Sequence, residues 1–363
     1  MDILTFIISL GIILIGCEFF TNGVEWAGKK FHLSEGAVGS VLAAVGTALP
    51  ETVIPIIAIF FMSTGASEEI GVGSILGAPF MLATLALFVC GLSVLIFAKK
   101  RKRKTLKVCG QLMRRDLKFF LIAYSIAVVA AFLPADLHEV HLAIGCLLVP
   151  IYVVYVYYTM KTGETCADDE VDPLYICKLT DKVELRGGKV IDGLLDPVER
   201  KIDSVLRTKE PDTWEIILQI ILSLGAIILG ANIFVEQIEL MSHSLGIQAI
   251  VLALLIVPIA TELPEKFNSF LWIREGKDTF AIGNITGAMV FQSCIPVTIG
   301  ILMTNWAIDL SDKGQMLQAL SIFIAMLSAV ILFFEARKDE IHVRGLMLGG
   351  ALYAVFIGVV LFA

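Results

Sequence analysis

The strongest constraint in this chain is a series of about ten long apolar stretches separated by short polar breaks. A helix needs about 20 consecutive apolar residues to cross the hydrocarbon core of a bilayer, and a lipid-exposed backbone must satisfy its own hydrogen bonds. The stretches lie at 3–27, 36–62, 70–98, 117–134, 140–160, 214–241, 247–272, 280–304, 315–335 and 342–362. The sequence therefore predicts an all-α polytopic membrane protein. The 57% share of hydrophobic residues agrees, because a soluble domain of this length could not bury so many.

Basic residues gather in the connections on one side of these spans, and acidic residues gather on the other. The basic side carries Lys29, Lys30, the run 99–104, Arg274, Lys277, Arg337, Lys338 and the long connection 161–212. The opposite side carries Glu68, Glu69, Asp136, Glu139, Asp309 and Asp312. Positive charge marks the cytoplasmic side, so we expect a bacterial or archaeal plasma-membrane protein with both termini outside. The run 99–104 could instead bind anionic lipid or nucleic acid, but its place beside a span favours the topology signal.

The two halves of the chain repeat each other. An offset of 214 positions pairs Gly16 with Gly230, Phe20 with Phe234, Glu25 with Glu239, Thr47 with Thr261, Leu49 with Leu263, Pro50 with Pro264 and Glu51 with Glu265. An offset of 210 then pairs Gly73 with Gly283, Ile75 with Ile285, Gly77 with Gly287 and Ala78 with Ala288. An ordered series of this kind predicts homologous repeats.

Each half holds about five spans, and an odd number makes the second copy enter the membrane from the opposite face. We therefore expect two inverted-topology five-helix repeats, at 1–160 and 213–363, joined by a cytoplasmic loop at 161–212. An acidic cluster in that loop could sense Ca²⁺, although it lacks the spacing of a dedicated calcium loop, and a solvated linker is favoured.

Matching motifs interrupt the second and seventh spans, at 46–51 (Gly-Thr-Ala-Leu-Pro-Glu) and 260–265 (Ala-Thr-Glu-Leu-Pro-Glu). Proline inside a helix displaces the carbonyl four residues earlier, which here belongs to Gly46 or Ala260. A freed carbonyl beside a carboxylate is a hard oxygen site of the kind that Ca²⁺ prefers.

The motif carboxylates must face a cavity, a cation or a proton, because an acidic residue at a helix centre costs about 2.5–3.5 kcal/mol in lipid. Glu262 and Glu265 are three residues apart, so one helical face presents both for joint ligation or a shared proton. The alternative is that Glu51, Glu262 and Glu265 are protonated and only form hydrogen bonds between helices.

These motifs resemble the two alpha-repeats of the sodium/calcium exchanger family, within the calcium/cation antiporter superfamily. The usual form is G-T-S-x-P-E followed by G-N-x-x-G-S-N, and the matching regions here lie near 46–82 and 260–296. The resemblance implies that spans two, three, seven and eight hold the ions while spans one and six move across them. It also implies that Glu51 and Glu265 are the central divalent ligands and that Thr47 and Thr261 add oxygens.

The chain departs from the family pattern at several ligand positions. Ala48 and Glu262 replace the family serine, Ala78-Pro79 and Ala288-Met289 replace the Ser-Asn pair, and Leu82 and Gln292 occupy the later polar position. Sodium ligands are therefore missing, which leaves room for proton coupling. Four neutral side chains could be secondary ligands or interhelical hydrogen-bond partners: Gln292, Ser293, Asn284 and Asn268. A softer metal held by Met289 and Cys294 is the weaker alternative.

Polar residues also follow one side of the first and sixth spans at spacings of three and four. They are Glu18, Asn22 and Glu25, with Asn232, Glu236 and Glu239. We read this stripe as an ion access path or, equally, as contact with lipid headgroups near the helix ends.

The sequence thus predicts a secondary antiporter that exchanges a divalent cation, Ca²⁺ before Mg²⁺ or Mn²⁺, for Na⁺ or H⁺ by alternating access. The alternatives are a cation channel and a degenerate exchanger acting as a sensor. We expect no enzyme and no bound cofactor, since no zinc helix, nucleophile elbow or nucleotide motif occurs. The expected partners are membrane lipid and inorganic cations, not nucleic acid or nucleotide.

Overall fold

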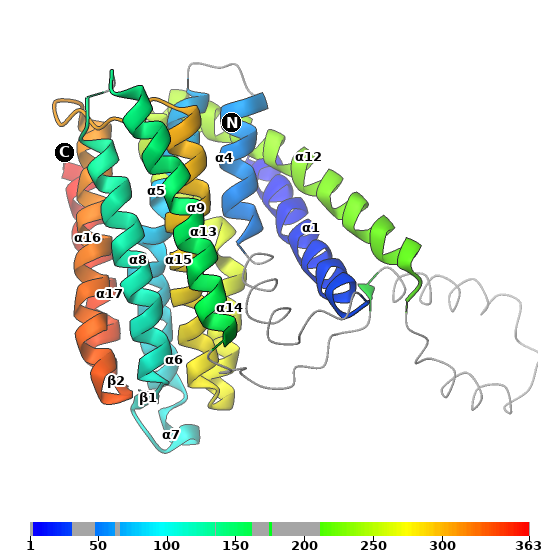
Figure 1. The fold of residues 1–363 in the computed structure, drawn as a ribbon, viewed down its shortest axis with the longest axis vertical. Coiled ribbons are helices and arrows are strands. Elements are labelled where there is room, and N and C mark those ends of the chain that lie inside the picture. The colour runs from blue at the N-terminus through cyan, green and yellow to red at the C-terminus, as the bar shows by residue number, and fades with distance from the viewer. Residues whose placement is uncertain are drawn as a thin grey trace, which may run out of the picture.

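The computed structural model describes residues 3–30, 48–61, 66–134, 136–161, 174–175 and 211–362, which form a bundle of helices with one small sheet (Figure 1). The helices of the first half are α1 (Ile3–Lys30), α4 (Leu49–Phe61), α5 (Ser67–Met81), the π-helix η2 (Leu82–Ala86), α6 (Leu87–Ile96), α7 (Ala98–Arg101), α8 (Gly110–Ala131) and α9 (His138–Lys161). Those of the second half are α12 (Thr213–Leu245), α13 (Ala249–Thr261), α14 (Leu263–Glu275), α15 (Asp278–Met303), α16 (Lys313–Glu335), the 3₁₀ turn η3 (Ala336–Lys338) and α17 (Val343–Phe362).

Each expected apolar stretch coincides with one helix or with consecutive helices, which confirms the polytopic helical fold. The stretch 70–98 is α5, η2 and α6 in series, and the stretch 247–272 is α13 followed by α14. The expected second span starts in residues outside the described ranges, and its described part is α4. Within these ranges, seven helical segments are long and apolar enough to cross a membrane by themselves.

The outer surface of the bundle is apolar, as a surface in contact with lipid must be. Large side chains such as Ile221 and Leu229 on α12, Val153 on α9 and Val355 on α17 are each about 60% exposed. Contiguous apolar exposure of this kind would drive aggregation in water. The exposed helix faces therefore agree with a protein that sits in a bilayer.

Helices α1 and α12 pack along their lengths as a pair inclined beside the rest of the bundle (Figure 1). A Cβ added to Gly16 would lie 3.3 Å from the Ser223 carbonyl oxygen, and a Cβ added to Gly230 would lie 3.1 Å from the Ser9 carbonyl oxygen. Ser9 and Ser223 are related by the offset that relates the two glycines. Such reciprocal contacts are typical of a two-fold interface, here between the two repeats of one chain.

Helix α5 approaches α13 closely enough to need glycine at two positions. A Cβ on Gly73 or Gly77 would overlap the carbonyl oxygen of Ile250 or Leu254, respectively. Pro79 lies two residues after Gly77 in α5, and η2 follows three residues later. Because proline lacks an amide, the helical hydrogen-bond ladder is already interrupted where this π-turn forms.

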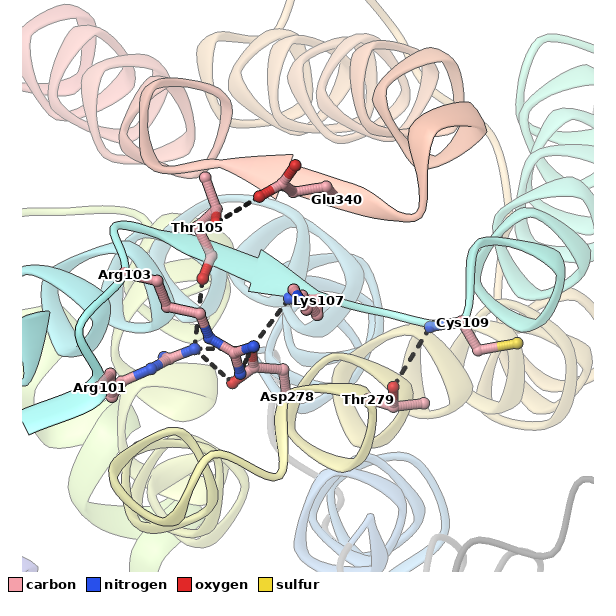
Figure 2. A network of polar contacts seen from close by, with 8 residues as sticks. All are labelled: Arg101, Arg103, Thr105, Lys107, Cys109, Asp278, Thr279 and Glu340. Atoms are coloured by element: carbon pink, nitrogen blue, oxygen red, sulfur yellow. Dashed lines mark hydrogen bonds and ion pairs between the residues drawn. The ribbon is translucent and has the colours of Figure 1, made fainter.

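One end of the bundle is fastened by a sheet and an ionic network that the sequence did not predict. Strand β1 (Thr105–Lys107) pairs antiparallel with β2 (Glu340–His342), which joins the α7–α8 connection to the α16–α17 connection. Beside this sheet, Arg101 and Arg103 donate to Asp278 at the start of α15 with distances of 2.6–2.8 Å, and the Lys107 amide adds a bond of 2.9 Å (Figure 2). Several of the basic segments expected on one side therefore lie together at one end.

Candidate cation site

The first motif carboxylate is held by the beginning of α4. This helix starts at Leu49, so Pro50 occupies its first turn, where the missing proline amide costs no helical hydrogen bond. Glu51 follows in the same turn and is 2% exposed. None of the described residues forms a hydrogen bond with either of its carboxylate oxygens. An ionised group in that position needs a compensating charge.

The second motif lies at a break between two helices. Helix α13 ends at Thr261, Glu262 has non-helical torsion angles of φ −86° and ψ 13°, and α14 begins at Leu263. Pro264 again falls in the first turn. The broken helix that the motif predicted is present, and the two Pro-Glu pairs occupy equivalent helix starts in the two repeats. The positive end of each helix dipole favours the nearby carboxylates.

The fold brings the three motif carboxylates into one buried region. Glu262 and Glu265 are fully buried, and their charges and that of Lys266 interact electrostatically with Glu51. Helix α4 contacts α13 and α15, so side chains from both repeats meet here. In the described part of the chain, no three His, Cys, Asp or Glu side chains form a preformed metal cluster.

Lys266 is a member of this region that the sequence analysis missed. Its side chain is 8% exposed, its Nζ lies 3.2 Å from Glu262 Oε2, and it donates to the Pro258 carbonyl oxygen at 3.2 Å. The signal in the sequence was the i,i+4 spacing of Glu262 and Lys266, which places opposite charges on one helical face.

The expected neutral ligands are in different environments. Gln292 is fully buried, and neither of its amide atoms has a hydrogen-bond partner among the described residues. Asn284 is half-buried, and its Nδ2 also lacks a partner there. The hydroxyl groups of Thr261 and Ser293 instead donate to carbonyl oxygens of their own helices, Val257 at 3.0 Å and Val290 at 2.9 Å.

Several expected site residues cannot be placed. Gly46 and Thr47 lie outside the described residues, and so do the side chains of Ala260 and Asn268. Their roles stay predictions.

The proposed access path runs along α1 and α12. Asn22 is buried there, and its Oδ1 accepts from Gln219 Nε2 at 2.9 Å and from the Tyr175 amide at 3.1 Å. Glu18 and Glu236 are exposed, and Asn232 donates to the Ile228 carbonyl oxygen of its own helix. Asn22 thus joins the two symmetry-related helices, and a role for the stripe in ion access stays a prediction.

A further buried acid, Asp116, lies on α8. Asp116 Oδ2 accepts from Thr286 Oγ1 on α15 at 2.8 Å, and Arg115 lies 3.6 Å from its other oxygen. The sequence analysis did not select this pair, because Asp116 lies outside both repeated motifs.

Comparison with known proteins assigns the chain to a family. The family model described as sodium/calcium exchanger protein matches residues 1–161 and 215–363. The chain belongs to this family. It is therefore an integral membrane protein of an antiporter family, and this agrees with the resemblance seen in its motifs.

Individual relatives are distant but align over most of their lengths. The putative antiporter CaxA of Alkalimonas amylolytica is 20% identical over 87% of this chain and 85% of its own. The structure of the H⁺/Ca²⁺ exchanger CAX matches with a TM-score of 0.67 at 16% identity, covering 99% of this chain and 82% of its own. The sodium-calcium exchanger NCX_Mj matches with a TM-score of 0.56 at 19% identity, covering 98% and 97%. These structures share the fold of this sodium/calcium exchanger family member.

Proposed function

We propose that this protein exchanges a divalent cation, Ca²⁺ in the first instance, for Na⁺ or H⁺ at a site containing Glu51, Glu262 and Glu265. The observation that carries the proposal is the burial of these three carboxylates together, with Glu51 and Glu265 at equivalent helix starts in the two repeats. Carboxylate oxygens are the ligands that Ca²⁺ selects, and buried ionisable groups in a membrane mark ion pathways.

Alternating access would use the division of the bundle into two parts. The pair α1–α12 lies against α4, α13 and part of α5, whereas α5, α8, α15 and α16 contribute to a common core. A two-fold pair sliding across a fixed core opens the site first to one side and then to the other.

The ligands of the site are compatible with either Na⁺ or H⁺ as the coupling ion. Ala78 and Ala288 are buried and supply no side-chain oxygen, so sodium would rely on other groups. A carboxylate cluster can carry protons with no further ligands. Relatives of both kinds share the fold, as exchangers described for H⁺ and for Na⁺.

The test is divalent-cation flux into proteoliposomes containing the purified full chain. Ca²⁺, Mg²⁺ and Mn²⁺ are tested separately under an outward Na⁺ gradient and under a pH gradient. Glu51→Gln and Glu265→Gln are each expected to lower the flux at least ~100-fold, because a charged ligand worth about 2.7 kcal/mol is lost. Glu275→Gln is the matched control, since Glu275 is exposed and pairs only with Lys277 across 3.3 Å in the described structure.

Binding is measured in parallel as Ca²⁺-dependent protection from thermal unfolding. Protection reaches about 2.7 kcal/mol when the ion is present at 100 times its dissociation constant, and it is expected to vanish in both site variants. Flux that ignores both gradients would indicate a channel. Protection without flux would indicate the sensor, and either result would overturn the antiporter proposal.

A further inference from the structure

The candidate site contains a lysine in surroundings where an ammonium is expensive. Lysine is almost never fully buried in proteins unless it is paired, and a membrane interior adds to the penalty. Lys266 is nevertheless 8% exposed, and its Nζ lies among oxygen atoms, 3.2 Å from Glu262 Oε2 and 3.2 Å from the Pro258 carbonyl oxygen. A carboxylate oxygen and a main-chain carbonyl oxygen are also the ligands of a small metal cation. The ammonium therefore occupies the kind of position that a monovalent cation would take.

The charges around Lys266 determine the net charge of the site. Glu51, Glu262 and Glu265 contribute three negative charges when ionised, and Lys266 contributes one positive charge. Among the described residues, the other buried acids are Asp116 and Asp278, and each has an arginine partner. With all four groups ionised, the site carries two net negative charges, which one divalent cation neutralises.

We infer that Lys266 is a tethered counter-ion that fixes the exchange at one divalent cation against two monovalent positive charges. The inference rests on the proposed function and adds its charge balance. Each carboxylate can bind one monovalent cation, and Lys266 neutralises one of the three, so two carboxylates are left to bind monovalent cations after the divalent cation leaves. Two Na⁺, two H⁺ or one of each would neutralise the two negative charges of the site on its return. One complete cycle would then move no net charge across the membrane.

Lys266 also has a mechanical alternative that the test must separate. Its bond to the Pro258 carbonyl oxygen links α14 back to α13 across the break at Glu262, and removing it could simply loosen the helix pair. A loosened pair lowers the transport rate but leaves the number of charges moved per cycle unchanged. Charge balance is therefore the decisive observable.

The experiment measures the equilibrium accumulation of Ca²⁺ in proteoliposomes with a potassium diffusion potential clamped by valinomycin. The full chain is compared with Lys266→Met and Lys266→Arg, and with Lys277→Met as the matched control on an exposed lysine. For the wild type, Lys266→Arg and Lys277→Met, accumulation is expected to be independent of voltage. For Lys266→Met, a third positive charge must come from solution, so accumulation is expected to change about tenfold for each ~60 mV.

Each outcome is decisive. Voltage-independent accumulation in Lys266→Met, at whatever rate, would overturn the counter-ion role while leaving the antiporter proposal in place. If Ca²⁺ accumulation by the wild type already changed about tenfold for each ~60 mV, the exchange of one divalent cation for two monovalent charges would be overturned. Absence of gradient-driven flux in the wild type would overturn the proposed function and, with it, the inference. If Lys266→Met is not monodisperse in detergent, Lys266→Gln takes its place, because it keeps a donor for the Pro258 carbonyl oxygen and removes the charge.

Discussion

Buried polar groups in this bundle fall into two kinds at the scale of single residues. The hydroxyl groups of Thr261, Ser293 and Thr84 donate to carbonyl oxygens of the preceding turn, so burial leaves their donors satisfied. Glu51 and Gln292 are buried with no hydrogen-bond partner among the described residues. A buried polar group without a partner costs about 1–3 kcal/mol, so a structural role alone does not account for these two.

Gln292 allows this distinction to be tested. Gln292→Leu keeps a similar volume and removes an unsatisfied amide, so we expect thermal stability without ions to be unchanged or higher by up to about 1–3 kcal/mol. If the amide oxygen is a ligand, the same variant loses about tenfold in Ca²⁺ affinity, measured by ion-dependent protection. Ser321→Ala on α16, whose hydroxyl donates to Gln318 at 2.7 Å, serves as the buried polar control. A drop in stability with unchanged affinity would show that Gln292 only packs the core.

The sequence predicted the carboxylates of the site but not its ammonium. Glu51, Glu262 and Glu265 were identifiable because an acid inside an apolar stretch is costly in lipid, and the apolar stretches can be read directly from the sequence. Lys266 follows Glu265 directly, and its basic side chain could as well have reached toward the headgroups at the helix end. Only the three-dimensional position of Pro258 and Glu262 shows that it points inward.

At the scale of helices, glycines permit two different close contacts between helices. Gly16 and Gly230 allow α1 and α12 to meet, whereas Gly73 and Gly77 allow α5 to lie against the backbone of α13. The second contact is made with the helix that carries Pro258, whose carbonyl oxygen accepts from Lys266. The spacing between α5 and α13 therefore helps set the position of the α13–α14 break.

Gly77→Ala is expected to be destabilising and to lower transport. The new Cβ would overlap the Leu254 carbonyl oxygen and lie 2.8 Å from Pro258 Cγ, and overpacking of this kind costs about 1–3 kcal/mol. Gly225→Ala on α12 is the matched control, since its Cβ would meet nothing within 4 Å and alanine favours the helix by about 0.5–1 kcal/mol. Unfolding in detergent and Ca²⁺ flux are measured for both. Equal stability of the two variants would contradict the close approach of α5 and α13.

The helices were predictable, and the contacts that fasten their ends were not. Long apolar stretches and the repeat offset indicated nearly every span, because the bilayer imposes a minimum length on each. Strands β1 and β2 have three residues each and lie more than 200 positions apart, so no local pattern marks them. The same holds for Arg101 and Asp278, whose pairing depends on how α7 and α15 end up side by side (Figure 2).

At the scale of the whole molecule, the two ends of the bundle differ in charge. One end holds the basic residues around the Asp278 network, namely Arg101, Arg103 and Arg274 near the start of α15. The other end holds acids in its connections: Glu68 accepts from the Asn305 amide at 2.6 Å, and Asp312 accepts from Gln248 at 3.1 Å. This polarity is the physical basis for an orientation.

From the positive-inside rule we predict that the Asp278 end faces the cytoplasm and the Glu68 end faces outside. We expect a cysteine introduced at the exposed position Lys100 to react with a membrane-impermeant maleimide only after permeabilisation of intact cells, and one at Ser311 to react before it. The background replaces all seven native cysteines, because Cys146 is exposed. Both sites must react after permeabilisation, which controls for accessibility within the fold. Labelling of Lys100→Cys alone in intact cells would reverse the orientation, and the 161–212 connection and both termini would then exchange sides.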